Sequence, residues 1–216
     1  MNLEQARTNM VEQQIRTWEV LDQDVLDLLY VVPREAFVPE KHRALAFSDL
    51  EIPMGEGQRM WQPKLEARVL QELNVRKADR VLEVGTGSGY FSALLSHRAA
   101  HVVSVEINPA LAAVGRANLE RHGADNVTLE IGDAARGWAA HAPYDVIVLT
   151  GSTPLLPPSF AEQLAPGGRL FAVVGEAPAM TARIVVSSGT GWRSTTLFET
   201  VILPLVNAEH PSRFRF

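Results

Sequence analysis

Arg80-Val-Leu-Glu-Val-Gly-Thr-Gly-Ser-Gly-Tyr90 combines a short apolar strand, an acidic residue and three alternating glycines. Because glycine has no Cβ, the backbone can turn sharply from a strand into a helix, and a ligand can lie directly on the main chain. We therefore expect a cofactor-binding loop that consists of Gly85, Thr86, Gly87, Ser88 and Gly89. The alternative is a tight strand-to-helix turn that binds nothing.

The spacing of the glycines indicates which cofactor the loop binds. A dinucleotide fold usually has the pattern G-x-G-x-x-G, but here the third glycine comes one residue early and Tyr90 takes its usual place. Glu83 lies just before the turn, where an acid would face the cationic amino group of an amino-acid-bearing cofactor better than a phosphate. These features favour S-adenosylmethionine, whose product is S-adenosylhomocysteine, with Glu83 in the cofactor site.

Two further acids follow the next two predicted strands. Glu106 ends the strand His101-Val-Val-Ser-Val-Glu106, where a carboxylate can accept hydrogen bonds from both ribose hydroxyls of a nucleotide. The alternative is a charge at a helix N-terminus, although Asn108-Pro109 already supplies a cap and a first-turn proline. Asp133 follows the third strand and could accept from an adenine amino group, or be a turn residue. The expected cofactor contacts here are Glu106, Ile107, Gly132, Asp133 and Ala134.

The composition fits one compact enzyme-sized domain. The chain has 216 residues, 46% of them hydrophobic, and no linker divides it. A formal net charge of −5 makes a nucleic-acid partner unlikely, and the absence of cysteine excludes disulfides, a thiol nucleophile and Cys-ligated metal. The six histidines are scattered, so we expect no metal site. The N-terminus lacks the apolar core of a signal peptide and no run is long enough to span a membrane, so we expect a cytoplasmic protein without a membrane partner. The oligomeric state cannot be read from the sequence.

Alternating hydrophobic patterns after residue 79 predict an α/β fold of the Rossmann-like type, with helices on both faces of the sheet. We expect strands near 81–84, 102–106, 127–131, 145–149, 169–174, 182–187 and 195–203, and helices near 89–98, 109–122 and 159–165. The first five strands should be parallel because their interiors are continuously apolar. The last two are joined through Ser188-Gly-Thr-Gly191, so at least one should be antiparallel at a sheet edge.

The first third of the chain is expected to be mostly helical. Asp22 should cap one helix, and Leu65, Val69 and Leu73 form an apolar stripe on another. We therefore expect a single domain over residues 1–216. Residues 1–78 would be a helical extension that forms part of a substrate-binding lip, and residues 79–216 the cofactor-binding core.

Phrases throughout the chain resemble one known family. They are Met10-Val-Glu-Gln-Gln-Ile-Arg16, Val32-Pro-Arg-Glu-Ala-Phe-Val-Pro39, Ile52-Pro-Met-Gly-Glu-Gly-Gln58 and Gln62-Pro63, then Gly132-Asp-Ala-Ala-Arg-Gly-Trp138, Tyr144-Asp-Val-Ile-Val-Leu-Thr150 and Leu164-Ala-Pro-Gly-Gly-Arg-Leu170. Together they resemble the protein-L-isoaspartate O-methyltransferases. The cofactor phrases are shared by many methyltransferases, whereas those in the N-terminal part are far more specific to this family.

The resemblance implies methyl transfer from S-adenosylmethionine to the α-carboxylate of an L-isoaspartyl residue, which starts protein repair. It also implies a Rossmann-like methyltransferase fold with a seven-stranded, mostly parallel sheet, and a place for Gln62 in the cofactor site. A carboxylate is already ionised at pH 7, so the reaction needs alignment and exclusion of water rather than a general base. Ser88 does not fit a hydrolase nucleophile, because the G-x-S-x-G pattern would need glycines at Thr86 and Tyr90.

One phrase departs from the family. The usual Gly-Gln-Thr-Ile-Ser-Gln-Pro is here Gly57-Gln-Arg-Met-Trp-Gln-Pro63, so Trp61 replaces the serine that lies where cofactor and substrate carboxylate meet. Trp can donate one hydrogen bond but accept none, and loss of one donor to a reacting oxygen can cost about 10² to 10³ in rate. Arg59, in place of threonine, could hold a carboxylate through two parallel hydrogen bonds. The alternatives are core packing for Trp61 and a solvated surface charge for Arg59.

Thr150, Gly151 and Ser152 follow the fourth strand, at the sheet edge where ligands of open α/β folds bind. We expect them to line the methyl-transfer pocket, the alternative being a plain strand-end turn. Two other functions remain open: a methyltransferase for a different carboxylate or a small molecule, and a catalytically inactive protein that binds the cofactor. The tail Arg213-Phe-Arg-Phe216 is assigned no role.

Overall fold

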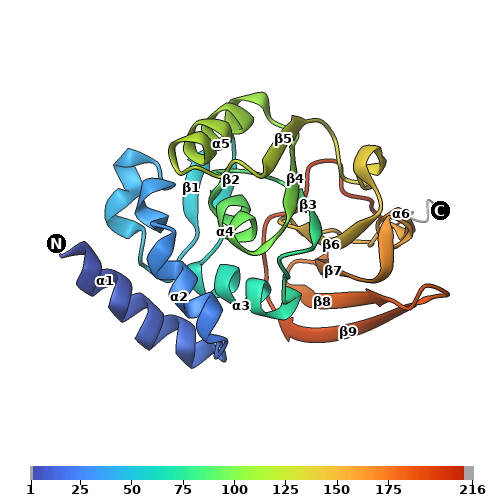
Figure 1. Ribbon diagram of the computed structural model, residues 1–216, viewed down its shortest axis with the longest axis horizontal. Coiled ribbons are helices and arrows are strands. Elements are labelled where there is room, and N and C mark those ends of the chain that lie inside the picture. The colour runs from blue at the N-terminus through green and yellow to red at the C-terminus, as the bar shows by residue number, and fades with distance from the viewer. Residues whose placement is uncertain (1, 212–216) are drawn as a thin grey trace.

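The computed structural model describes residues 2–211, so the tail from Arg213 lies outside the described residues. Seven strands form one sheet in the order β5-β4-β3-β6-β7-β8-β9, with helices packed against it (Figure 1). The strands are β3 (Arg80–Val84), β4 (His101–Glu106), β5 (Val127–Ile131), β6 (Tyr144–Leu149), β7 (Leu164–Glu176), β8 (Ala179–Ser187) and β9 (Trp192–Glu199). β3 to β7 pair in parallel, and β8 runs antiparallel to both its neighbours. The expected fold class is confirmed.

The pleat of the parallel strands divides their side chains between two apolar clusters. Val81, Val102 and Val146 belong to one cluster, whereas their chain neighbours Leu82, Val103 and Ile147 belong to the other. Successive side chains of a strand point to opposite faces, and here both faces are covered. That burial explains why these strands consist of uninterrupted apolar runs.

Four helices pack against this sheet or beside the cofactor loop: α3 (Pro63–Leu73), α4 (Tyr90–Arg98), α5 (Pro109–Arg121) and α6 (Pro158–Glu162). As expected, the Asn108 side chain caps α5 by accepting from the backbone N–H groups of Ala110 and Leu111. The expected helix at 159–165 was too long. It ends at Glu162 because Leu164 already pairs with Tyr144 of β6 as the first residue of β7.

The last expected strand, 195–203, also ends early, at Glu199. The Thr200 N–H still donates to the Met180 carbonyl of β8, and after it the backbone leaves β8 and pairs with Ser152 instead. The Ser152 N–H donates to the Leu203 carbonyl and the Leu205 N–H donates to the Ser152 carbonyl, both over 2.9 Å. This pairing brings residues 203–206 over the carboxyl ends of the central strands.

The N-terminal part contains α1 (Leu3–Asn9), a π-helical turn (Met10–Ile15), α2 (Gln23–Val31) and short 3₁₀ turns at Arg16–Trp18, Arg34–Ala36 and Glu40–Leu45. The expected cap and apolar stripe are confirmed: Asp22 accepts from two backbone N–H groups of α2, and the three stripe residues of α3 are buried. The segment was expected to be mostly helical, and the structure adds one non-helical element to it. A β-hairpin, β1 (Ile52–Gly55) and β2 (Gln58–Met60), precedes α3, in strands too short to give a clear period.

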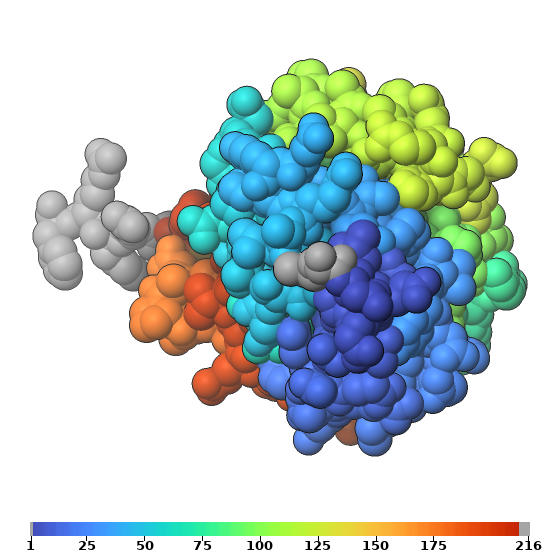
Figure 2. All heavy atoms as spheres, turned by 90° about the vertical axis from the view of Figure 1, so that its left-hand side faces the viewer, coloured from blue at the N-terminus to red at the C-terminus, as the bar shows by residue number. Residues whose placement is uncertain are grey.

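Figure 2 shows the N-terminal segments spread over one side of the molecule. Their apolar side chains are continuous with the core: Val25 and Leu29 of α2 share one buried cluster with Leu70 of α3 and Val81 of β3. Among residues 2–211, no helix combines the length and the apolar character needed to cross a membrane. The same residues contain no group of three or more His, Asp or Glu side chains that could hold a metal ion.

Candidate active site

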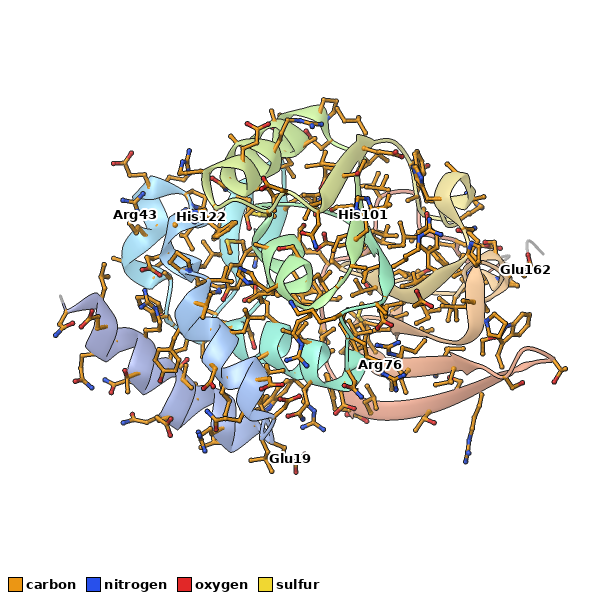
Figure 3. All side chains as sticks on the ribbon, viewed as in Figure 1. Glu19, Arg43, Arg76, His101, His122 and Glu162 are labelled. Atoms are coloured by element: carbon orange, nitrogen blue, oxygen red, sulfur yellow. The ribbon has the colours of Figure 1, made fainter. Side chains whose placement is uncertain are left out.

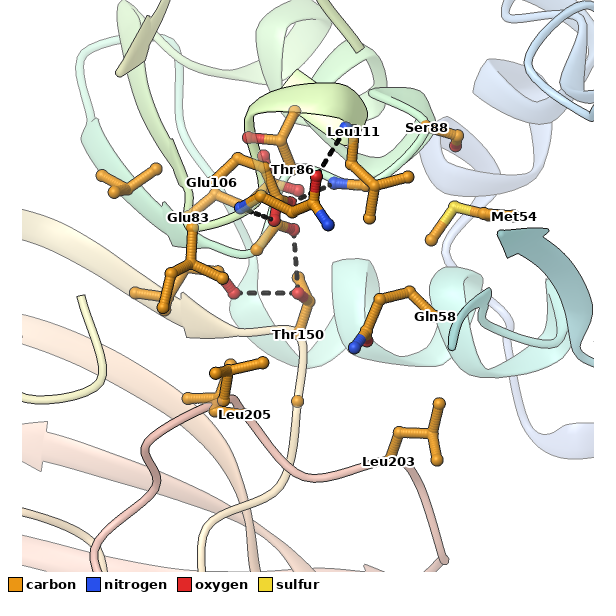
Figure 4. Close-up of a pocket in the computed structure, with 18 of the residues that line it drawn as sticks. Met54, Gln58, Glu83, Thr86, Ser88, Glu106, Leu111, Thr150, Leu203 and Leu205 are labelled. Atoms are coloured by element: carbon orange, nitrogen blue, oxygen red, sulfur yellow. Dashed lines mark hydrogen bonds between the residues drawn. The ribbon is translucent and has the colours of Figure 1, made fainter. Parts of the chain in front are cut away.

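A cavity of about 380 Å³ opens at the carboxyl ends of β3, β4, β5 and β6. This volume is in the range typical of small-molecule sites. Figure 4 shows Met54 and Gln58 of the hairpin on one side, Leu203 and Leu205 on another, and the glycine loop with its acids opposite them. The expected site residues that line the cavity are Arg59, Trp61, Glu83, Gly85, Thr86, Gly87, Ser88, Glu106, Ile107, Gly132, Asp133, Ala134 and Thr150.

The strand-to-helix turn has the shape that the sequence predicts. Gly85 has φ +99°, and a Cβ on it would lie 2.2 Å from the Thr150 hydroxyl oxygen. That hydroxyl lies 2.8 Å from the carbonyl oxygens of both Val84 and Gly85, so it fixes the turn from the neighbouring strand. A Cβ on Gly87, with φ +53°, would approach the Met54 methyl group at 2.9 Å. The loop therefore runs tightly between β6 and the hairpin.

Glu106 connects the loop to the next helix. Its carboxylate is buried and accepts from the Gly87 N–H over 2.9 Å and from the Asn108 N–H over 3.0 Å. Each carboxylate oxygen has a second lone pair, so Glu106 can accept further hydrogen bonds from a ligand in the cavity. The backbone contacts hold this carboxylate in place without a ligand.

Glu83 is fully buried, and burial raises its pKa to about 8. One carboxyl oxygen accepts from the Ser92 hydroxyl and, over 2.7 Å, from the Ser104 hydroxyl. Ser104 in turn lies 2.6 Å from the hydroxyl of Thr86 in the glycine loop. The other oxygen, Oε1, has no hydrogen-bond partner among the described residues. With a pKa near 8 this side chain is mainly a carboxylic acid at neutral pH, and a nearby cation would favour its ionised form.

Asp133 follows β5 and lines the cavity. Its carboxylate accepts from the Ala135 N–H and from the Asn207 side-chain amide, each over 2.9 Å. The second contact ties the C-terminal segment to the edge of the cavity. The contact with Ala135 is the local hydrogen bond of a turn residue, whereas the contact with Asn207 comes from a distant segment, so both interpretations of Asp133 stay open.

Trp61 is part of the cavity wall and of the core. The residue is 7% exposed, and its ring centroid lies 5.6 Å from that of Phe91 and 6.4 Å from that of Phe171. Its carbonyl oxygen accepts from the buried Arg34 guanidinium over 2.5 Å. Arg59, two residues earlier, has a side chain that is 53% exposed. Of the residues that depart from the family phrase, Trp61 is packed and Arg59 lies at the mouth of the cavity.

Three expected residues are not among those that line the cavity. Gly89 begins α4 with φ +81° and a Cβ there would lie 3.0 Å from the Gly115 carbonyl oxygen, so it allows α4 and α5 to pack closely. Gln62 precedes α3, where its carbonyl accepts from two backbone N–H groups. Ser152 is buried beneath the 203–206 segment and its hydroxyl donates to the Ile202 carbonyl, whereas its neighbours Thr150 and Gly151 do line the cavity.

Two parts of the lining were largely missing from the site expected from the sequence, which included only Arg59 from them. The hairpin contributes Met54, Gln58 and Met60, and its Gly55-Glu-Gly57 turn was a signal that could have located it. The C-terminal segment contributes residues 203–206, which carry no motif. Their position depends on the backbone pairing with Ser152, and no local sequence pattern predicts that pairing.

Comparisons with known proteins agree on one family. The family model described as Protein-L-isoaspartate(D-aspartate) O-methyltransferase (PCMT) matches residues 5–210. The chain is 40% identical over 204 residues to the protein-L-isoaspartate O-methyltransferase of Protochlamydia amoebophila, covering 93% of this chain and 96% of that protein. It is 45% identical over 169 residues to that of Methanoculleus marisnigri, covering 78% and 77%.

Solved structures show the same likeness. A protein-L-isoaspartate O-methyltransferase superposes with a TM-score of 0.79 at 25% identity, covering 92% of this chain and 65% of that one. A Plasmodium falciparum protein of the same description, in complex with S-adenosyl-L-homocysteine, superposes with a TM-score of 0.78 at 19% identity, covering 92% and 97%. The second likeness concerns the fold.

Proposed function

The chain belongs to the protein-L-isoaspartate(D-aspartate) O-methyltransferase family, and on this premise we propose that it methylates the free carboxylate of an isoaspartyl residue in proteins. The methyl donor is S-adenosylmethionine. The observation that carries the proposal is the cavity at the sheet edge, where a glycine turn and three acids from successive strands meet. The reaction forms a bond from a carboxylate oxygen to the methyl carbon and breaks the bond from that carbon to sulfur.

The residues present fit this donor. The turn at Gly85 and Gly87 leaves no room for a Cβ beside it and exposes its backbone to the cavity. Glu83 keeps one buried, unpartnered oxygen, and an ammonium group near it would supply the missing hydrogen bond and favour the ionised carboxylate. Glu106 is placed to accept from ribose hydroxyls, and Asp133 lies further along the same edge.

We assign the donor site accordingly. Glu83 would hold the amino group, Glu106 with Ile107 the ribose, and Asp133 with Gly132 and Ala134 the adenine. The backbone from Gly85 to Ser88 would support the middle of the molecule. When bound, the donor supplies an electrophilic methyl carbon on a sulfonium centre.

The chain's own task is then to align the acceptor and exclude water. A carboxylate acceptor is ionised at neutral pH, so no side chain has to remove a proton. The walls between the hairpin and the C-terminal segment are largely apolar and include Met54, Met60, Trp61, Leu203 and Leu205. Apolar walls keep water from the reacting atoms and strengthen the attraction between the anion and the sulfonium.

Trp61 favours a second candidate acceptor, a small-molecule carboxylate. Its indole is wedged between Phe91 and Phe171, so it serves as a wall and not as a mobile hydrogen-bond partner. An indole at this position leaves less room for an acceptor than the serine usual in the family. The second candidate therefore has the same donor site and the same bond changes, but a smaller acceptor.

Calorimetry with S-adenosylhomocysteine, followed by transfer of labelled methyl groups to an isoaspartyl peptide, tests the proposal. We expect binding, and base-labile methyl ester on the isoaspartyl peptide but not on the aspartyl peptide of the same sequence. Glu106→Gln should weaken binding about tenfold or more, because hydrogen bonds to a charged group contribute about 1.5–3 kcal/mol. Glu120→Gln, on the exposed face of α5, is the matched control and should leave binding unchanged. Binding without ester on any carboxylate would exclude the proposed activity.

A further inference from the structure

The cavity that binds the donor is lined almost entirely by acids among its ionisable residues. These are Glu51, Glu56, Glu66, Glu83, Glu106 and Asp133. Among the described residues that line it, Arg59 is the only lysine, arginine or histidine. Glu83 is mainly protonated and Glu66 is paired with Arg34, but the remaining acids suit a cationic donor and repel an anionic acceptor. The sulfonium of the donor attracts the carboxylate deep in the cavity, and a positive side chain at the mouth would offset the repulsion on entry.

The other arginine near the cavity, Arg34, already forms hydrogen bonds within the protein. Arg34 is 1% exposed, and its guanidinium donates to the Glu66 carboxylate, the Ala46 carbonyl and the Trp61 carbonyl. Its charge is balanced by Glu66 in a buried pair, with an N–O distance of 2.9 Å. Arg34 therefore stabilises the wall and does not offer hydrogen bonds to a ligand.

Arg59 differs in each of these respects. It lies on β2, opposite Pro53 in the hairpin, and its side chain is half-exposed at the mouth of the cavity. Its one side-chain contact among the described residues is a long one, 3.5 Å from a terminal guanidinium nitrogen to Glu51. A guanidinium has five N–H donors and can bind a carboxylate through two parallel bonds. Most of the hydrogen-bonding capacity of Arg59 is thus available to a ligand.

We propose that Arg59 binds the carboxylate of the acceptor at the mouth of the cavity, so that this chain selects anionic acceptors through a residue on the hairpin. This inference rests on the proposed function and names the recognition step of the same site. Trp61 replaces a small hydroxyl deeper in the cavity, and Arg59 supplies the polar contact closer to solvent. The residue acts in binding, so its loss should affect acceptor affinity and KM more than kcat.

The experiment measures binding of an isoaspartyl peptide to the protein saturated with S-adenosylhomocysteine. The variants are Arg59→Gln, which keeps a polar side chain but removes the charge, and Arg59→Lys, which keeps the charge but loses the paired geometry. The control is Arg43→Gln, an exposed arginine at the outer surface of the N-terminal part (Figure 3). A second peptide carries an amide in place of the isoaspartyl α-carboxylate.

We expect Arg59→Gln to weaken binding of the carboxylate peptide about tenfold or more, Arg59→Lys to weaken it less, and Arg43→Gln to leave it unchanged. Affinity for S-adenosylhomocysteine should be the same in all variants, which shows that each is folded. The amide peptide should bind the unaltered protein as weakly as the carboxylate peptide binds Arg59→Gln. A carboxylate peptide that binds Arg59→Gln within twofold of the unaltered protein, or that does not bind the unaltered complex, overturns the inference.

Methyl ester formation, measured on the same samples with S-adenosylmethionine, separates this inference from the proposed function. Binding that depends on Arg59 but yields no ester would refute the methyl transfer and leave the recognition intact. Ester formed with the same KM by Arg59→Gln and the unaltered protein would refute the role of Arg59 and leave the activity intact.

Discussion

Gly85 and Gly123 both have backbone angles that favour glycine, but the space around their missing Cβ atoms differs. Gly85 has φ +99° and a Cβ would meet the Thr150 hydroxyl at 2.2 Å. Gly123, after α5, has φ +66° and open space within 4 Å. A left-handed conformation costs an ordinary residue about 1–2 kcal/mol. Alanine substitutions at the two positions therefore separate two contributions to the free energy of unfolding: the backbone conformation, which both share, and the contact with Thr150, which only Gly85 has.

We expect Gly123→Ala to lower the free energy of unfolding by about 1 kcal/mol and Gly85→Ala to lower it by roughly 2–4 kcal/mol. The larger loss follows because the Thr150 hydroxyl would have to move away from the carbonyls it contacts, and a net hydrogen bond contributes about 0.5–1.5 kcal/mol. Urea titration gives both values. Gly85→Ala alone should also weaken S-adenosylhomocysteine binding. Equal losses in the two variants would show that Thr150 does not constrain the turn.

Glu83 predicts a pH dependence of stability. Its pKa is raised from an ordinary 4.5 to about 8, chiefly by burial. Between these values the folded protein holds a proton that the unfolded chain releases, so the unfolding free energy falls as pH rises. This contribution is complete below about pH 4.5 and is lost by about pH 8.

Glu83→Gln cannot ionise and keeps an oxygen that accepts from Ser92 and Ser104. The unfolding free energy of this variant minus that of the unaltered protein should therefore become more positive from pH 5 to pH 9. Urea titrations at several pH values measure that difference. A difference that does not vary with pH would mean that Glu83 is ionised in the folded protein throughout.

At the scale of elements, one buried ion pair connects the N-terminal turns to α3. Arg34 from the 3₁₀ turn at Arg34–Ala36 pairs with Glu66 of α3, and both side chains are almost fully buried. Removing one partner of such a pair leaves a buried charge without compensation, at a cost of about 3–5 kcal/mol. The same arginine holds the Trp61 carbonyl, so the cavity wall depends on this connection.

Arg34→Ala should therefore destabilise the protein by about 3–5 kcal/mol, whereas Arg16→Ala should cost less than about 1 kcal/mol. Arg16 is a matched control because it pairs with Glu12 on an exposed surface, with 39% and 49% of the two side chains accessible. Thermal and urea unfolding of both variants provide the comparison. A loss in Arg34→Ala no larger than that in Arg16→Ala would contradict a structural role for the buried pair.

The elements that could be located from the sequence are those marked by residues close together in the chain. Continuous apolar runs located the five parallel strands, and Asn108 and Asp22 located helix starts through their capping side chains. Prediction from the sequence failed where tertiary pairing decides the outcome. Leu164 was expected in a helix but pairs with β6 as the first residue of β7. The chain beyond β9 was expected to continue as a strand but pairs with Ser152. The raised pKa of Glu83 was likewise beyond local patterns, because it depends on burial among three elements.

The lining of the cavity also contains residues that could be predicted from the sequence and residues that could not. The glycine loop and the acids at the strand ends were predictable, since carboxyl ends of parallel strands share one edge of a sheet. Met54, Gln58 and Met60 of the hairpin and residues 203–206 were not, because they reach the cavity from outside the sheet. The departures at Arg59 and Trp61 were visible in the sequence. Only the structure separates them into a half-exposed guanidinium and a packed indole.

At the scale of the whole molecule, the N-terminal extension and the sheet share one core. A single apolar cluster includes Val25 and Leu29 of α2, Leu70 of α3, Val81 of β3 and Phe171 of β7. Unfolding the extension alone would expose the sheet side of that cluster to water, at about 25 cal/mol per Å² of apolar surface. We therefore propose that residues 2–211 form one cooperative domain, and that the extension is not an independent lid.

Hydrogen exchange with and without ligand tests this cooperativity. Amides of α2 (Gln23–Val31) and of β4 (His101–Glu106) should report opening free energies that agree within about 1 kcal/mol, because both open only on global unfolding. S-Adenosylhomocysteine at 100 times its Kd should raise the global value by about 2.7 kcal/mol. The residues of α2 do not line the cavity, yet their protection should rise by the same amount as that of β4. Protection that rises in β4 but not in α2 would show that the extension opens separately from the core that binds the donor.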